Sequence, residues 1–177
     1  MKDGSTDRGT TNTIAPDTFV TIDVHKESLH FSCAHFTIFG QSERENLHGH
    51  NFFVRASATG PIGDDGLCFD YTELKDALAS LCDQLDETTL LPEGSPYLEF
   101  EKSDQYVTVF FGNERLVFLK RDILLLPLRN ITVEELARWF LEKLHETELL
   151  KRSSIHKLEL TLSSGPSQSA SISWTKP

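Results

Sequence analysis

The chain has 177 residues with 17 Lys or Arg and 27 Asp or Glu, and its formal net charge of −10 with no basic run argues against a nucleic-acid-binding protein. This length fits one domain with a sizeable core. Three cysteines without a Cys-x-x-Cys pair indicate reduced thiols, and no apolar stretch is long enough to cross a bilayer, so we expect a soluble, cytoplasmic protein without nucleic-acid or membrane partners.

The N-terminal segment, residues 1–16, is polar and has no hydrophobic period, which predicts a disordered tail before a single domain at 17–177. A stretch at 60–66 is dense in Gly and Asp and predicts a turn. Apolar alternation predicts extended structure in four segments before the first helix: 19–24, 28–35, 51–58 and 67–70.

Two segments then change to helical period. The first helix is predicted to begin at Thr72, a good N-cap, and the second at Thr132, which opens the capping-box sequence Thr-Val-Glu-Glu. Apolar residues recur at helical spacing on one face of each segment: Leu74, Leu78, Leu81 and Leu85 in the first, and Leu136, Phe140, Leu141 and Leu144 in the second. Each helix should therefore bury one face against a sheet.

A long insert, about 90–127, separates the two helices. Within it, 106–111 and 116–119 flank a Gly-Asn-Glu-Arg turn and predict a hairpin. After the second helix, the alternation at 158–163 and 169–174 predicts two closing strands joined by a Gly-Pro-Ser turn. This order of elements indicates an α+β fold with an antiparallel sheet and both helices on one face.

The most informative motif is His48-Gly49-His50, which follows His35 at a distance of 13 positions. Residues i and i+2 of a strand share one side, so His48 and His50 can present their rings together, and a neighbouring strand would bring His35 to them. Three neutral nitrogens with a fourth position left open hold a catalytic zinc, whereas structural zinc is enclosed by four protein ligands. We therefore predict a Zn²⁺ site at His35, His48 and His50.

Further segments, in the same order along the chain, resemble the 6-pyruvoyl-tetrahydropterin synthase and 6-carboxytetrahydropterin synthase family. These are Phe-Ser-Cys-Ala-His at 31–35, Leu-His-Gly-His-Asn at 47–51, Gly-Leu-Cys-Phe-Asp-Tyr at 66–71, Gln-Leu-Asp at 84–86 and Thr-x-Glu at 132–134. The resemblance implies the tunnelling fold, in which a four-stranded antiparallel sheet with two helices closes into a barrel through oligomerisation. It also implies a pterin substrate bound between subunits of a trimer or of a homo-hexamer built as a dimer of trimers.

The chain departs from the family's usual pattern before His-Gly-His, where most members carry a nucleophilic cysteine and 41–47 has none. The segment resembles instead a subtype with Arg-Glu-x-Leu-His-Gly-His, and Glu45 stands at the place of its glutamate. Glu45 can serve as an acid/base group if burial raises its pKa and if its loop folds back on the metal. Cys33, on the same strand side as His35, has three interpretations: a surrogate nucleophile, a fourth ligand, or a buried core residue.

Other matched positions take roles that the resemblance implies. Asp86 matches an aspartate of the family, and Glu87 replaces the histidine of its proton relay, so both are candidates to assist Glu45 in acid/base chemistry. The resemblance places pterin contacts at Thr132 and Glu134 and, in place of a ring-anchoring glutamate, at Ser163 or Ser164.

The leading hypothesis is a zinc-dependent lyase that converts 7,8-dihydroneopterin, or its phosphate, to 6-hydroxymethyl-7,8-dihydropterin, the reaction associated with the glutamate-bearing subtype. The first alternative is a 6-pyruvoyl- or 6-carboxy-tetrahydropterin synthase that acts on dihydroneopterin triphosphate; the missing cysteine and relay histidine count against it. The second alternative is a zinc- and pterin-binding homologue without turnover, which a serine at the ring-anchor position favours.

Overall fold

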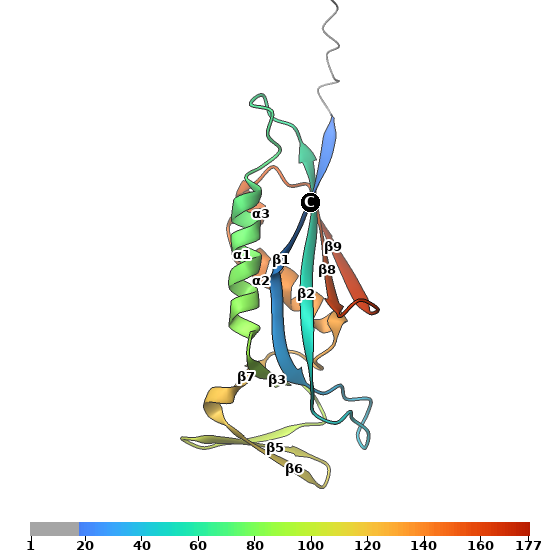
Figure 1. The fold of residues 1–177 in the computed structure, drawn as a ribbon, viewed down its shortest axis with the longest axis vertical. Coiled ribbons are helices and arrows are strands. Elements are labelled where there is room, and N and C mark those ends of the chain that lie inside the picture. Colours follow the sequence, from blue (N-terminus) through green and yellow to red (C-terminus); the bar gives the residue numbers. More distant parts are fainter. Residues whose placement is uncertain (1–17) are drawn as a thin grey trace, which may run out of the picture.

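The structure is a computed structural model that describes residues 18–177, apart from the side chain of Arg152. The predicted N-terminal tail, 1–16, lies outside the described residues. Four strands form a continuous antiparallel sheet in the order β1-β2-β8-β9 (Figure 1). Their bounds are β1 Phe19–His35, β2 His48–Pro61, β8 Lys157–Ser164 and β9 Ser169–Thr175. These confirm the predicted opening and closing strands.

β1 is a single long strand, although the sequence predicted a break in its middle. Its pairing with β2 changes register between His25 and His30, so the break is an irregularity within one strand. The predicted extended segment at 67–70 is wrong, because no strand forms there. That segment leads instead into the first helix, and Asp70 occupies the N-cap position.

The insert forms more structure than the predicted hairpin. β3 (Thr88–Pro92) and β7 (Ile123–Leu126) add in parallel beyond β1, so the main sheet has six strands and is mixed rather than four-stranded and antiparallel. The predicted hairpin is confirmed as β5 (Tyr106–Phe111) and β6 (Glu114–Leu119), although β6 begins two residues earlier than predicted because the turn is shorter. It pairs with β4 (Glu99–Lys102) in a separate three-stranded sheet. A short 3-10 helix, Lys120–Asp122, joins β6 to β7.

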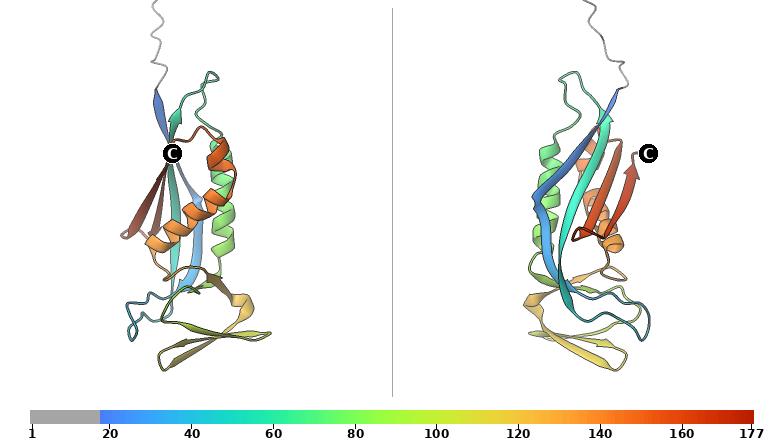
Figure 2. Two further views of the ribbon diagram at one scale, coloured as in Figure 1. Left: turned by 180° about the vertical axis from the view of Figure 1, so that it is seen from behind. Right: turned by 45° about the vertical axis from the view of Figure 1, so that its right-hand side comes forward.

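Two main helices cover one face of the six-stranded sheet (Figure 2). They are α1 (Tyr71–Leu85) and α2 (Val133–Glu146), and a short α3 (Leu149–Arg152) follows them. Asp70 rather than Thr72 caps α1, since its carboxylate accepts the Thr72 N–H at 2.8 Å. Thr132 caps α2 as predicted and accepts the Glu135 N–H at 3.3 Å. In a full capping box the Glu135 carboxylate would accept the N–H of Thr132. Here it accepts the Arg129 N–H instead, at 3.3 Å.

The main core lies between the sheet and the helices, and every apolar helix residue predicted to face it is buried. Phe31 on β1 stacks on Phe52 of β2 with ring centroids 5.1 Å apart and on Phe140 of α2 at 6.1 Å. At the end of this core the rings of Phe52 and His35 meet in a T-shaped arrangement, with their centroids 5.4 Å apart. The histidine therefore lies where the apolar interior gives way to polar side chains.

A second apolar cluster joins the three-stranded sheet to the main sheet. Its buried members include Phe36, Leu91, Val107 and Phe111. Phe36 is the residue after His35, so this cluster connects the insert to the chain segment that directly follows β1. The insert is thus packed beside the histidines rather than held at a distance from them.

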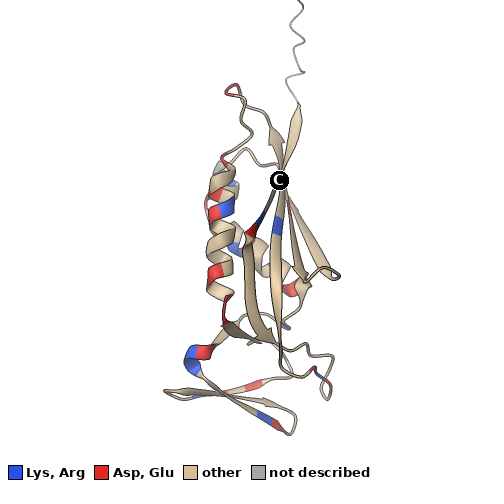
Figure 3. Cartoon of the chain, viewed as in Figure 1, with Lys and Arg blue, Asp and Glu red and all other residues tan. Residues whose placement is uncertain are grey.

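Figure 3 shows Lys and Arg residues interspersed with Asp and Glu residues along the chain. Among residues 18–177, no helix is long and apolar enough to span a bilayer.

Candidate metal centre

The three predicted metal ligands converge because β1 and β2 are antiparallel neighbours. His35, the last residue of β1, pairs with His48, the first residue of β2, and His50 lies two residues further on the same side. The ring centroids are 4.8 Å apart for His35 and His48, 5.4 Å for His35 and His50, and 4.7 Å for His48 and His50. One nitrogen of each ring lies within 4.8 Å of those of the other two.

Backbone carbonyl groups orient two of the rings. Nδ1 of His35 lies 3.1 Å from the Ile131 carbonyl oxygen, and Nδ1 of His48 lies 2.8 Å from that of Asn46. A carbonyl oxygen can only accept, so each Nδ1 carries the proton and each Nε2 presents a lone pair. This is the hydrogen-bonding pattern that fixes the tautomer of metal-binding histidines.

The free nitrogen of His35 is the strongest sign that the site suits a cation. His35 is 5% exposed, and its Nε2 is the one buried side-chain nitrogen or oxygen in residues 18–177 without a hydrogen-bond partner. An unpaired buried group of this kind costs free energy that a ligand would recover. Nε2 of His48 and Nε2 of His50 face each other at 2.9 Å, close to the ~3.3 Å that two ligands of a tetrahedral zinc require. The histidines therefore fit a zinc ion.

The metal-binding group contains no cysteine or carboxylate among the described residues. Cys33 is 5% exposed and belongs to the main core. Burial, followed by the field of Asp86, raises the pKa of the Cys33 thiol to about 12. A thiol held neutral in this way is a poor nucleophile and a poor zinc ligand, so core packing is the best interpretation of Cys33. Three histidines with a fourth position free match a catalytic rather than a structural zinc site.

Acid should destabilise the zinc-free protein through His35. Burial, followed by the charges of His48 and His50, lowers the pKa of His35 from 6.5 to about 4. Between these values the unfolded chain binds a proton that the folded chain excludes, so the free energy of unfolding falls as the pH falls from 6.5 toward 4, by at most about 3 kcal/mol from this group. Thermal unfolding of the zinc-free protein at pH 7 and pH 4.5 should show a smaller loss of Tm in His35→Gln. Equal losses in both proteins would contradict this assignment.

Glu45 reaches the histidines because residues 36–47 fold back as a small hairpin loop. Ile38 and Arg44 form an isolated antiparallel bridge, and the Glu45 N–H donates to the Thr37 carbonyl oxygen at 2.9 Å. The Thr37 N–H in turn donates to Oε2 of Glu45 at 2.9 Å. These two bonds place the Glu45 carboxylate in the cavity of the histidines, as the sequence required for an acid/base role.

The ionisation of Glu45 differs from the sequence-based expectation. Burial tends to raise the pKa of its carboxyl group, but the hydrogen bonds from Thr37 and the fields of His48 and His35 together outweigh burial, and the net pKa lies below its usual value. The expected rise toward neutrality is therefore wrong, because a carboxylate that accepts an N–H is stabilised in its charged form. The Glu45 side chain is therefore held in its ionised form, which accepts hydrogen bonds and does not donate them.

The histidines and Glu45 line one cavity of about 560 Å³ together with all three predicted pterin contacts. The start of α2 supplies Thr132 and Glu134, and the end of β8 supplies Ser164. Ser164 is held by the turn that follows it, since its N–H donates to the Gln168 carbonyl oxygen at 3.0 Å. The residues predicted from four separate segments of the sequence therefore line one cavity.

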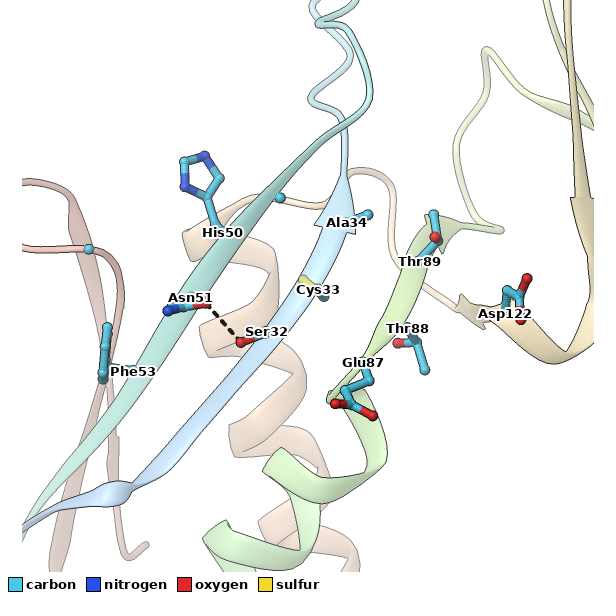
Figure 4. Close-up of a pocket in the computed structure, with 12 residues that line it drawn as sticks. Ser32, Cys33, Ala34, His50, Asn51, Phe53, Glu87, Thr88, Thr89 and Asp122 are labelled. Carbon is cyan, nitrogen blue, oxygen red and sulfur yellow. Dashed lines mark hydrogen bonds between the residues drawn. The ribbon is translucent and has the colours of Figure 1, made fainter.

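Asp86 and Glu87 do not line this cavity. The Asp86 carboxylate accepts the Ser32 N–H at 2.7 Å at the end of α1. Glu87 lines a second cavity of about 730 Å³, beside β1, β2 and β3 (Figure 4). There the Ser32 hydroxyl donates to Asn51 Oδ1 at 2.7 Å. His50 borders both cavities, so the cavity that Glu87 lines adjoins the cavity of the histidines.

Sequence reasoning missed the residues that support the site. Asn130 accepts the Ile38 N–H at 3.0 Å and donates to the Ile38 carbonyl oxygen at 2.8 Å, which anchors the loop that carries Glu45. The Ile131 carbonyl oxygen orients His35. Such contacts leave no signal in a sequence, because any residue supplies a backbone carbonyl and a single asparagine before a helix is common.

Comparisons with known proteins agree with this geometry. Residues 23–173 match the family "6-pyruvoyl tetrahydropterin synthase". Solved structures of 6-pyruvoyl tetrahydropterin synthase from Plasmodium vivax and from Plasmodium falciparum each share 32% identity with the chain at a TM-score of 0.85. Each match covers 90% of this chain and 100% of the Plasmodium chain. A Methanocaldococcus jannaschii protein named "Putative 6-carboxy-5,6,7,8-tetrahydropterin synthase" is 28% identical over 144 residues, which are 80% of this chain and 88% of that protein.

The family match covers most of the described chain, and the His35, His48 and His50 cluster is consistent with the zinc site of this family. The solved relatives share the α+β fold at high similarity over their whole length. The chain therefore belongs to the 6-pyruvoyl tetrahydropterin synthase family and is an enzyme of the lyase class.

Proposed function

We propose that the protein is a zinc-dependent pterin synthase that acts on the C6 side chain of 7,8-dihydroneopterin triphosphate and forms a 6-pyruvoyl- or 6-carboxy-tetrahydropterin. The names of its relatives support this substrate class. The observation that carries the proposal is the unpartnered Nε2 of His35, which shares a cavity with His48, His50 and the Glu45 carboxylate. A zinc ion held there would polarise a hydroxyl or carbonyl oxygen of the side chain and lower its pKa.

Glu45 would move the protons that this reaction requires. Its carboxylate is ionised at the start, so it would first remove a proton from the side chain and then return it at another atom. Two further Plasmodium vivax structures are described as catalytic residue mutants, in which a glutamate is replaced by alanine in one and by cysteine in the other, so the catalytic residue of that relative is also a glutamate. This supports Glu45 as the group that takes the place of a nucleophilic cysteine.

The pterin ring would lie between α2 and the end of β8. The Glu134 carboxylate can accept ring N–H groups, and the hydroxyl groups of Thr132 and Ser164 can both donate and accept. A serine is a weaker anchor than a carboxylate, so Glu134 would carry most of the ring recognition. Glu87 would assist from the second cavity, with Asp86 next to it in the chain, and this requires that a neighbouring subunit bring that cavity to the site.

The assembly would be a trimer or a homo-hexamer. β9 and β7 lie at the two edges of the six-stranded sheet, and the helices cover only one of its faces. Edge strands with unpaired backbone groups favour pairing with another chain, and closure of the sheet would also cover the opposite face. Light scattering on the purified protein should report three or six chains, and a monomer would contradict this assembly.

A second candidate reaction is cleavage of the side chain to give 6-hydroxymethyl-7,8-dihydropterin. Glu45 would deprotonate the C2′ hydroxyl, the C1′–C2′ bond would break with release of glycolaldehyde, and C1′ would take up a proton. Two observations favour it: no cysteine lines the cavity of the histidines, and none of its 14 lining residues is Lys or Arg. A triphosphate would meet Glu45 and Glu134 there with no Lys or Arg side chain to offset its charge, which would leave a bound zinc ion as the only compensating charge.

One experiment separates the two reactions. Zinc-loaded protein is incubated with 7,8-dihydroneopterin triphosphate and, in parallel, with 7,8-dihydroneopterin, and the oxidised products are separated and detected by fluorescence. A 6-pyruvoyl or 6-carboxy product from the triphosphate supports the synthase, whereas a 6-hydroxymethyl product supports the cleavage. If neither substrate is consumed although the protein binds a pterin, both proposed reactions fail.

A further inference from the structure

Arg44 occupies an unusual position between the metal site and the insert. Its guanidinium carbon lies 4.9 Å from the ring centroid of Phe36 and 5.8 Å from that of Phe111, and its side chain is 14% exposed. Phe36 follows β1, and Phe111 ends β5. An arginine held between two aromatic faces keeps one orientation, which sets it apart from an exposed surface charge.

The same guanidinium contacts two acidic residues on opposite sides. Its Nε donates to Oε2 of Glu114 at 2.8 Å, and its Nη2 donates to the same oxygen. Its Nη1 donates to the backbone carbonyl oxygen of Glu45 at 2.7 Å. Glu114 is the first residue of β6, directly after the turn that joins β5 to β6. Arg44 thus links the tip of the insert hairpin to the backbone of the proposed acid/base residue.

The loop of residues 36–47 therefore has two external supports. Asn130, just before α2, forms two hydrogen bonds with the backbone of Ile38. On the other side, Glu114 holds Arg44, and Arg44 holds Glu45. The strand-like bonds between Thr37 and Glu45 lie between these supports, so both affect where the carboxylate points.

We propose that Arg44 is a positioning residue and that the insert hairpin, through Glu114, holds the Glu45 carboxylate in line with the three histidines. This inference rests on the proposed acid/base role of Glu45. It gives the insert a function in the reaction, because a displacement of about 1 Å of a catalytic group can cost about 100-fold in rate. Lysine cannot replace Arg44, since one ammonium group lacks the planar fork that reaches Glu114 and Glu45 together.

The test uses Glu114→Gln, because Glu114 is exposed and its replacement leaves the loop sequence intact. Loss of the charge-assisted bonds should lower kcat by about tenfold and leave KM, zinc content and Tm unchanged. Amide hydrogen exchange should become faster in the peptide that spans 36–47, which reports the position of the loop without any turnover. Glu101→Gln, an exposed glutamate on β4 of the same sheet, is the matched control and should change neither quantity.

Arg44→Lys provides a second variant with its charge retained, and it should show the same loss of kcat and the same faster exchange. Adding Glu114→Gln to Arg44→Lys should cause little further loss of kcat, because both residues act through one contact.

If hydrogen exchange in Glu114→Gln is unchanged, the proposal that Glu114 and Arg44 hold the loop is overturned, whatever the turnover. Faster exchange with kcat equal to that of Glu101→Gln overturns the role of these two residues in the reaction. If wild-type protein consumes no pterin, the proposed function fails. The comparison of hydrogen exchange still shows whether Glu114 and Arg44 hold the loop.

Discussion

Glu45→Gln should retain zinc and lower kcat by about 100-fold or more, the usual scale for loss of a general base. Glutamine has nearly the shape of glutamate, and its carbonyl oxygen can still accept the Thr37 N–H that holds the side chain in place. The amide cannot act as a base, so the rate of the chemical step should fall while pterin binding and folding are unchanged. Turnover with the preferred pterin and zinc content by mass spectrometry are the two measurements.

Glu43→Gln is the matched control, because Glu43 is an exposed carboxylate of the same loop and does not line the cavity. It should turn over at the wild-type rate.

The pH dependence of kcat gives a further check on Glu45. Since the pKa of Glu45 lies below its usual value, the carboxylate stays ionised as the pH falls to mildly acidic values, and kcat should decline only at lower pH. A near wild-type rate in Glu45→Gln would assign proton transfer to another group.

His48→Ala should lose its zinc and, with it, its activity. Removing one of three protein ligands leaves too few nitrogens for a stable tetrahedral site, and we expect zinc affinity to fall by at least about 100-fold, which exceeds the usual effect of losing a supporting hydrogen bond. His48 is only half-buried, so the fold should survive. Metal content after dialysis and competition with a chelator measure the effect.

His25→Ala serves as the control for that variant, because His25 is an exposed histidine of β1 outside the metal-binding group. It should bind zinc as the wild type does. Undiminished zinc in His48→Ala would remove the metal assignment, and the unpartnered Nε2 of His35 would then need another ligand.

The cluster of three histidines could be predicted from sequence because its arrangement depends on local rules. Alternation along a strand places His48 and His50 on one side, and antiparallel pairing of neighbouring strands brings in His35. Helical period likewise predicted the buried faces of α1 and α2. Each of these inferences needs only the spacing of residues within one or two adjacent segments.

The parts that sequence reasoning missed depend on pairing between distant segments. β3 and β7 consist mainly of continuous apolar residues without alternation, as expected of buried parallel strands, and such runs resemble loops or helix fragments. The lowered pKa of Glu45 depends on the Thr37 N–H, and the orientation of Arg44 depends on a hairpin 70 residues away. None of these contacts could be inferred from the pattern of residue types.

The segment before α2 holds two groups at once. Ile131 fixes the ring of His35 through its carbonyl oxygen, and the adjacent Asn130 grips the loop of Glu45 at Ile38. If that segment moves, we expect His35, the proposed zinc ligand, and Glu45, the proposed proton acceptor, to move together, so that the distance between them changes little. A common attachment point of this kind would preserve the distance between the two groups during fluctuations of the rest of the fold.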